Sequence, residues 1–175
     1  SCDFRGRIYC STSSFSPQGP DYARAILLFA NGKPLGKRGV HWLKIHGANC
    51  YGYDKVSYAE RIKWVETHTK DILNVAKNPI DHRDLWANSD KPWQFLAFCF
   101  EYKRYLEKGE DYISHLPIGV DGSCNGLQNF SAMLRDKRGG HATNLLPGLT
   151  PNDIYTEVAK VCTDKLKAST EPEAR

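Results

Sequence analysis

A single carboxylate at the end of an apolar segment is the first feature of the sequence that could support chemistry. Residues 116–120 are Leu-Pro-Ile-Gly-Val, and Asp121 and Gly122 follow directly. If residues 116–121 form a short buried strand, its end would hold the carboxylate rigidly, and the glycine would let a ligand approach the backbone. This pattern suits Mg²⁺, which binds one or two carboxylates together with phosphate oxygens and water. A plainer alternative, in which Asp121 caps the following helix, stays open.

The same stretch allows a second kind of chemistry through Cys124. This cysteine lies in a Gly-Ser-Cys-Asn-Gly turn ahead of a predicted helix, and His141 lies downstream. Cysteines of low pKa favour helix N-termini, so a nucleophilic thiolate is conceivable. The spacing matches none of the local signatures of cysteine proteases, which argues against this role.

Two arginines flank a glycine close to the N-terminus. Residues 3–9 are Asp-Phe-Arg-Gly-Arg-Ile-Tyr, so Arg5 and Arg7 lie between Asp3 and Tyr9. This combination suits contact with a phosphate backbone, with a base or sugar packed nearby. A cluster of surface ion pairs would explain the same residues equally well.

Basic charge is concentrated between residues 33 and 63. Seven basic residues face two acidic ones there, a net charge of +5, whereas the whole chain carries +4. The interleaved aromatic residues are Trp42, Tyr51, Tyr53 and Trp64. Such a block suits contact with a polyanion, although a solvated helix face is the alternative.

The elements that must position these residues are mostly helical. A strand-like pair is expected at Ile8-Tyr9 and a Ser/Pro/Gly-rich loop at 11–20. A capping box at Ser57–Glu60 predicts the start of a helix that ends before Pro79. The other predicted elements are helices over 22–30, 40–48, 93–106, 126–135 and 154–167, a polar loop over 80–92 and a strand over 116–121. Many helices, few strands and no alternation of the two predict an α+β fold.

The length allows one globular domain of ordinary size, or a domain plus a fragment of another. The chain has 175 residues, of which 41% are hydrophobic and 25% charged. The longest apolar runs have six residues, whereas a membrane helix needs about 20, so no membrane partner is predicted. The six cysteines include no Cys-x-x-Cys pair, which predicts reduced, mostly buried thiols and neither a zinc site nor a disulfide framework.

Two motifs together resemble a known family. Asp-x-x-Gly-Arg at 3–7 and Asp-Gly-Ser-Cys-Asn-Gly-Leu-Gln at 121–128 resemble the single-subunit RNA polymerases of bacteriophages and their mitochondrial relatives. Further stretches resemble the phage branch in the same order, and they lie at 42–49, 95–102, 131–136 and 144–147. The resemblance therefore extends over nearly the whole chain. It implies that residues 1–136 form a polymerase palm, with a helical insertion at about 33–111. Residues 137–175 would begin the fingers with their first helix, and a frayed tail would start at about 169.

The resemblance implies a two-metal nucleotidyl transfer. Asp121 would be the first of two aspartates that bind Mg²⁺, and Gly122 would lend its carbonyl oxygen. The family places its second aspartate downstream of the region that this chain covers. Asp136 and Asp153 read instead as helix-terminus residues. The chain is therefore expected to be a polymerase fragment that is inactive on its own.

The implied partners are a DNA template, nascent RNA, nucleoside triphosphates and the remainder of the polymerase. The residues that would position the template and the hybrid are Asp3, Arg5, Arg7 and Tyr9. Lys55, in Gly-Tyr-Asp-Lys-Val at 52–56, would lie near the triphosphate, and Tyr155, in Asn-Asp-Ile-Tyr at 152–155, beside the nucleotide pocket. The implied location is the cytoplasm of an infected bacterium or, alternatively, the mitochondrial matrix, because Asn125 and Asn129 depart from the phage pattern. A stand-alone nucleic-acid-binding module without catalysis is the alternative function.

Overall fold

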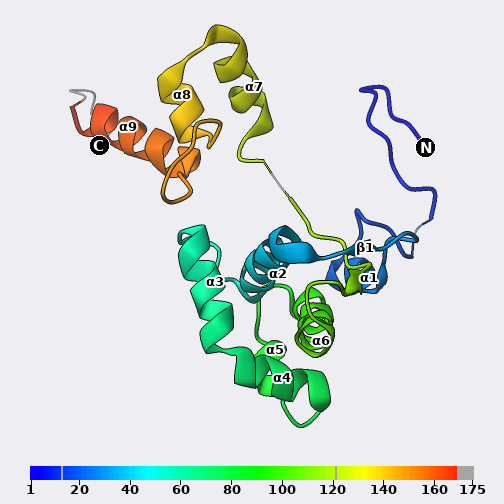
Figure 1. Ribbon diagram of the computed structural model, residues 1–175. Helices are drawn as coiled ribbons and strands as arrows, with labels where there is room; N and C mark the ends of the chain where they lie inside the picture. Colours follow the sequence, from blue (N-terminus) through cyan, green and yellow to red (C-terminus); the bar gives the residue numbers. More distant parts are fainter. Residues whose placement is uncertain (13, 121, 169–175) are drawn as a thin grey trace. The chain divides into compact units, whose positions relative to one another are not determined.

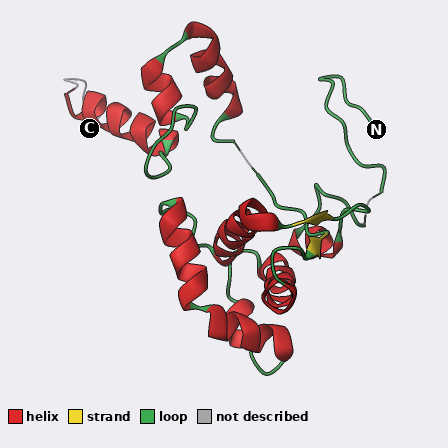
Figure 2. Cartoon of the chain, in the orientation of Figure 1, coloured by secondary structure: helices red, strands yellow, loops and turns green. Residues whose placement is uncertain are grey.

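The computed structural model describes residues 1–12, 14–120 and 122–168 (Figure 1). Most of them are helical, and the named strands form one small antiparallel sheet (Figure 2). The chain divides into two compact units, Ser1–Gly119 and Val120–Arg175. Many helices and few strands agree with the predicted α+β class.

Six helices and two short strands make up the regular structure described in the first unit. The helices are α1 (Asp21–Ile26), α2 (Gly36–Tyr51), α3 (Tyr58–Thr67), α4 (Thr69–Lys77), α5 (Arg83–Trp86) and α6 (Pro92–Lys108). Strand β1 (Lys33–Pro34) pairs with β2 (Ile113–Ser114), with Lys33 opposite Ser114. No helix in the described residues is long and apolar enough to cross a membrane.

Helix α6 is the centre of the first unit, because α1, α2 and α4 all pack against it. Its Phe98 and Cys99 are fully buried, and α2 contributes Leu43 to the same core. Gly47 of α2 faces the Phe98 ring so closely that an added Cβ would collide with it. Since burying a phenylalanine is worth about 1.5–3 kcal/mol, this contact is a major part of the α2–α6 interface.

The predicted capping box is confirmed, but the helix that it begins is shorter than expected. The Ser57 hydroxyl accepts from the Glu60 amide, and the Glu60 carboxylate accepts from the Ser57 amide. The single predicted helix breaks at His68 into α3 and α4. The side chains of Thr67, His68 and Thr69 each bond the carbonyl four residues earlier. Such bonds compete with the helix ladder and favour bending, which the hydrophobic period does not reveal.

Several predicted boundaries before Asp121 are wrong. Helix α2 covers Gly36–Tyr51 rather than 40–48, and α5 lies within the predicted polar loop at 80–92. The first helix ends at Ile26 rather than Ala30, because residue 27 is extended and the following segment pairs with His115. The Phe29 amide donates to the His115 carbonyl at 2.9 Å, and the His115 ring donates to the Phe29 carbonyl at 2.7 Å. Residues 116–120 form no strand. The pairing with β1 ends at Ser114, and His115 bonds the segment around Phe29 instead. Asp121 itself lies outside the described residues.

The second unit contains α7 (Asn125–Leu134), α8 (Lys137–Ala142) and α9 (Ile154–Ala168) in its described part. The predicted α7 and α9 are confirmed, and the sequence pattern missed α8. Asp136 caps α8 by accepting from the amides of Arg138 and Gly139. Asp153 accepts from the Tyr155 amide at 3.0 Å. Both acids are therefore helix-terminus residues, as predicted.

The cysteines are all free, but the prediction that most are buried is wrong. Cys50 and Cys99 are buried in the core, whereas Cys2, Cys10 and Cys162 are exposed. Burial raises the pKa of the Cys50 thiol to about 12, and His46 beside it has a pKa lowered by burial to about 4. Both groups are therefore uncharged at neutral pH and belong to the packing of α2.

Candidate functional site

The N-terminal arginine motif forms a hairpin organised by Asp3. One carboxylate oxygen accepts from the amides of Arg5 and Arg7, both at 2.9 Å. The other accepts from the Tyr9 hydroxyl at 3.0 Å. Gly6 occupies the turn with φ of +76°, a conformation that favours glycine. The hydrogen bond from the Arg7 amide is the main reason why the pKa of Asp3 lies below its ordinary value.

Because the Asp3 carboxylate accepts from backbone amides, the guanidinium groups of Arg5 and Arg7 are left for other partners. Within the described residues, no ion pair joins Asp3 to Arg5 or Arg7. Both arginines are exposed, and the Arg5 guanidinium lies 5.3 Å from the centre of the Phe4 ring. The hairpin is therefore not the ion-pair cluster that the sequence left open. It presents two exposed cations beside an exposed aromatic ring, a combination that suits contact with a phosphate backbone.

Lys55 lies in the loop between α2 and α3, and its side chain is 86% exposed. Its ammonium group forms an ion pair with Asp54 at 3.0 Å. The loop is fixed by Arg61, which is only 5% exposed. The Arg61 guanidinium donates to the carbonyls of Asp54 (2.7 Å) and Val56 (3.0 Å) and to the side chain of Asn49 (2.9 Å). In the sequence, Arg61 is one of the charges of the basic block, and nothing local marks it as buried.

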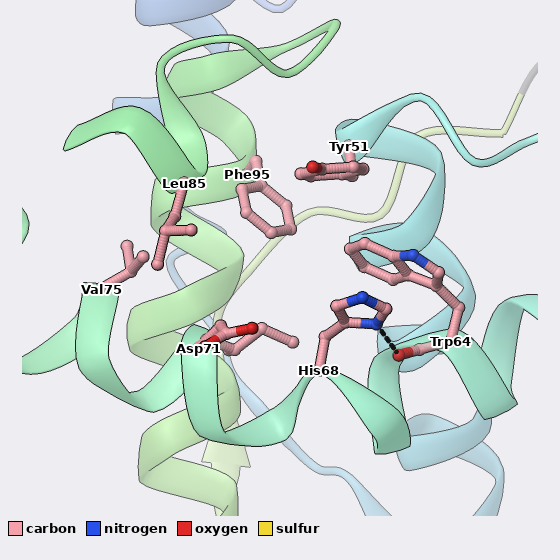
Figure 3. Close-up of a pocket in the computed structure, with 8 residues that line it drawn as sticks. Tyr51, Trp64, His68, Asp71, Val75, Leu85 and Phe95 are labelled. Atoms are coloured by element: carbon pink, nitrogen blue, oxygen red, sulfur yellow. Dashed lines mark hydrogen bonds between the residues drawn. The ribbon is translucent and has the colours of Figure 1, made fainter. Parts of the chain in front are cut away.

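Three of the four aromatic residues of the basic block pack together, because Tyr51 and Tyr53 both lie against Trp64, whereas Trp42 packs against Tyr58. Tyr51 packs against Trp64 with ring centroids 4.5 Å apart, and Trp64 stacks on His68 at 4.4 Å (Figure 3). These rings and Phe95 surround a cavity of only about 40 Å³. Ligand sites usually measure about 300–1,000 Å³. The cavity is therefore a packing defect beside the core and cannot hold a nucleotide.

In the second unit, the loop that follows Asp121 is brought together with the start of α9. An added Cβ at Gly122 would collide with the side-chain amide oxygen of Asn125, so that side chain would have to move to admit one. Cys124 has a left-handed backbone (φ 51°) directly before α7. A side-chain hydrogen bond with Cys124 is the main cause that raises the pKa of Tyr155. Two predicted site residues, Gly122 and Tyr155, therefore belong to one local arrangement.

The geometry does not support a nucleophilic Cys124. The Nδ1 atom of His141 lies 2.9 Å from the side-chain nitrogen of Asn152, and no hydrogen bond within the described residues joins this imidazole to Cys124. The described residues also contain no group of three or more His, Cys, Asp or Glu side chains that could hold a metal. Asp136 and Asp153 are occupied as helix caps. Asp121, the predicted metal ligand, lies outside the described residues.

Comparison with known proteins identifies the family. A family model described as DNA-dependent RNA polymerase matches residues 33–175. The chain belongs to this family. The match covers α2 to α9 and includes the stretch at 121–128. The resemblance inferred from the two motifs is thus confirmed.

Individual relatives come from phages and from organelles. The chain is 52% identical to T7 RNA polymerase of Escherichia phage T7 over 166 residues, 95% of the chain and 19% of that relative. It is 44% identical over 161 residues to the mitochondrial DNA-directed RNA polymerase of Neurospora crassa, 91% of the chain and 11% of that relative. It is 45% identical over 161 residues to the chloroplastic DNA-directed RNA polymerase 3B of Nicotiana tabacum, 90% of the chain and 16% of that relative. The chain therefore spans about a fifth or less of the length of these relatives.

Proposed function

We propose that the chain is a catalytic segment of a DNA-directed RNA polymerase, which transfers nucleotides from nucleoside triphosphates to an RNA 3′ end. The observation that carries the proposal is the 52% identity to T7 RNA polymerase over 95% of the chain. The family match also includes the Asp-Gly-Ser-Cys-Asn-Gly-Leu-Gln stretch. Residues 1–136 would belong to the palm, about 33–111 to its helical insertion, and 137–175 to the start of the fingers.

In this proposal, Asp121 and the carbonyl oxygen of Gly122 contribute to a Mg²⁺ site. Their oxygen atoms are the hard ligands that Mg²⁺ prefers, and the absence of a side chain at residue 122 keeps the backbone accessible. When bound, a pair of Mg²⁺ ions supplies the charge that activates the RNA 3′-hydroxyl and stabilises the pyrophosphate leaving group. The residues of the chain act by positioning and charge, without a covalent intermediate. A second aspartate from another part of the polymerase would complete the site, so the isolated chain is expected to be inactive.

The other proposed roles are based on which side chains are exposed to solvent. The N-terminal hairpin (residues 1–9), with Asp3 and Tyr9 as its internal support, would direct Arg5 and Arg7 toward the template strand and the nascent hybrid. Lys55 would approach the triphosphate of the incoming nucleotide, and Tyr155 would lie beside the nucleotide pocket. The higher identity to the phage relative favours the cytoplasm of an infected bacterium as the location, with the mitochondrial matrix as the alternative.

Template-directed extension of an RNA primer tests the proposed function. The polymerase that contains this chain is incubated with Mg²⁺, four ribonucleotides and a DNA template of defined sequence. Products whose sequence follows the template are expected. A purified, folded polymerase that binds the template without extending the primer would support the non-catalytic alternative instead.

The basic block allows a sharp test of Lys55 in the same polymerase. Lys55→Ala is expected to raise the KM for nucleotides several-fold, because a charge-assisted hydrogen bond is worth about 1.5–3 kcal/mol and exposure to water reduces that value. Lys55→Arg should recover part of the loss, and Lys55→Gln little. Steady-state kinetics with varied nucleotide concentration measure the effect.

Lys37→Ala is the matched control, since Lys37 is also exposed in the basic block but lies outside every motif that resembles the family. Its nucleotide KM should stay at the wild-type value. Equal effects of the two substitutions would indicate diffuse electrostatics, and the specific role of Lys55 would then be wrong.

A further inference from the structure

The side chain of Asn144 joins three segments of the second unit. Asn144 follows α8, and its backbone is left-handed with φ of 59°. Its amide nitrogen donates to the Ser123 hydroxyl and to the Asn152 carbonyl, both at 2.9 Å. Its amide oxygen accepts from the Asn152 amide at 2.7 Å. One half-buried side chain therefore connects the loop after Asp121, the turn after α8 and the segment that leads into α9.

Asn152 extends this connection to α8 and α9. Its side-chain nitrogen donates to the His141 carbonyl at 2.8 Å, which fixes the segment on α8. Three residues further on, at the start of α9, the Tyr155 amide donates to the Asp153 carboxylate at 3.0 Å. The loop at 122–124 is thus tied to the segment that leads into α9 through Ser123, Asn144 and Asn152.

Few residue types could replace Asn144. A left-handed backbone disfavours most side chains, and asparagine is among the few that adopt it routinely. Aspartate would keep the acceptor for the Asn152 amide but lose both donated bonds. Glycine would keep the backbone conformation and lose all three bonds, so it separates the side-chain contacts from backbone strain.

We propose that Asn144 is a positioning residue that fixes the loop carrying Gly122 relative to Tyr155, and through them the metal and nucleotide sites. This inference rests on the proposed function. If it is correct, weakening the connection changes how tightly the polymerase binds Mg²⁺ and nucleotide, and not only how stable it is.

The test uses Ser123→Ala and Asn144→Gly in the intact polymerase. Both variants are expected to raise the Mg²⁺ concentration at half-maximal rate and the nucleotide KM, each by roughly three- to tenfold, with a smaller change in kcat. Ser123→Ala removes only the bond to Asn144, so the double variant should be no worse than Asn144→Gly alone. Asn144→Asp should resemble Asn144→Gly in both constants, because it also loses the bond to Ser123.

Thr143→Val is the structural control. The buried Thr143 hydroxyl donates to the Gly139 carbonyl at 2.8 Å, next to Asn144 but without contact to the loop. Loss of this hydrogen bond should lower thermal stability and leave the nucleotide KM and the Mg²⁺ concentration at half-maximal rate unchanged. If Asn144→Gly or Ser123→Ala lowers only thermal stability, as Thr143→Val does, the inference is overturned. Additive effects in the double variant would overturn it too. Activity that survives Asp121→Asn would instead count against the proposed function, so the two failures are distinguishable.

Discussion

Replacing Asp121 by Asn in the intact polymerase is expected to abolish nearly all RNA synthesis and to leave DNA binding unchanged. The amide keeps the shape of the carboxylate but removes the charge that a metal ion needs, while the proposed template contacts of the N-terminal hairpin stay in place. Single-turnover primer extension and a DNA-binding assay measure the two effects separately. Retention of more than about a tenth of the wild-type kcat, about 1.4 kcal/mol of barrier, would be too much for a direct metal ligand.

Asp136→Asn is the matched control for this substitution. It makes the same chemical change 15 positions later in the chain, at a residue whose carboxylate only caps α8. Asparagine caps helices about as well as aspartate, so kcat should stay close to the wild-type value. A large loss of activity in Asp136→Asn would mean that the assay reports general charge or folding and not metal binding.

The fold could be predicted from the sequence where local chemistry determines it. The capping box at Ser57–Glu60 and the cap at Asp153 mark helix starts through bonds between residues two or three positions apart. Helix α8 escaped prediction because it is a six-residue helix that contains Gly139 and Gly140, which weaken any helical pattern. The strand expected at 116–121 failed for a different reason: a strand depends on a partner, and the apolar pattern does not say where that partner lies.

The candidate site also contains some features that the local sequence determines and others that depend on distant partners. The hairpin of residues 3–9 is local, and its motif indicated both its acid and its cations. Arg61 and Asn144 were missed because their partners lie 5 to 12 and 8 to 21 positions away. Each reads as an ordinary polar residue in the sequence. Their roles depend on which backbone groups the fold leaves without a partner, and that is a property of the three-dimensional structure.

Arg61→Ala is expected to be the most damaging substitution for the structure around Lys55. It removes three hydrogen bonds of a buried guanidinium and leaves two carbonyls and the Asn49 side chain without their donor. Such a loss should lower the local free energy of opening by about 2–4 kcal/mol, since each unsatisfied buried group costs about 1–3 kcal/mol and water can reach some of them. Hydrogen–deuterium exchange of residues 49–67 in the intact polymerase measures it.

Arg38→Ala is the control, because Arg38 is an exposed arginine of the same basic block. It should change the free energy of opening of residues 49–67, as measured by hydrogen exchange, by no more than about 0.5 kcal/mol. Comparable effects of the two substitutions would show that charge, and not the buried hydrogen bonds, stabilises the loop.

Arg61→Lys separates the structural role of Arg61 from its consequence for Lys55. Lysine keeps the positive charge, but its single ammonium group cannot reproduce the planar fork that serves Asp54, Val56 and Asn49 together. We therefore expect faster exchange in the loop and, with it, a rise in the nucleotide KM similar to that of Lys55→Ala. The double variant should then show little further rise, because both changes remove the same contact with the nucleotide. A loosened loop with an unchanged KM would mean that Lys55 reaches the triphosphate without support from Arg61, or that it does not reach the triphosphate at all. The Lys55→Ala result decides between these two outcomes.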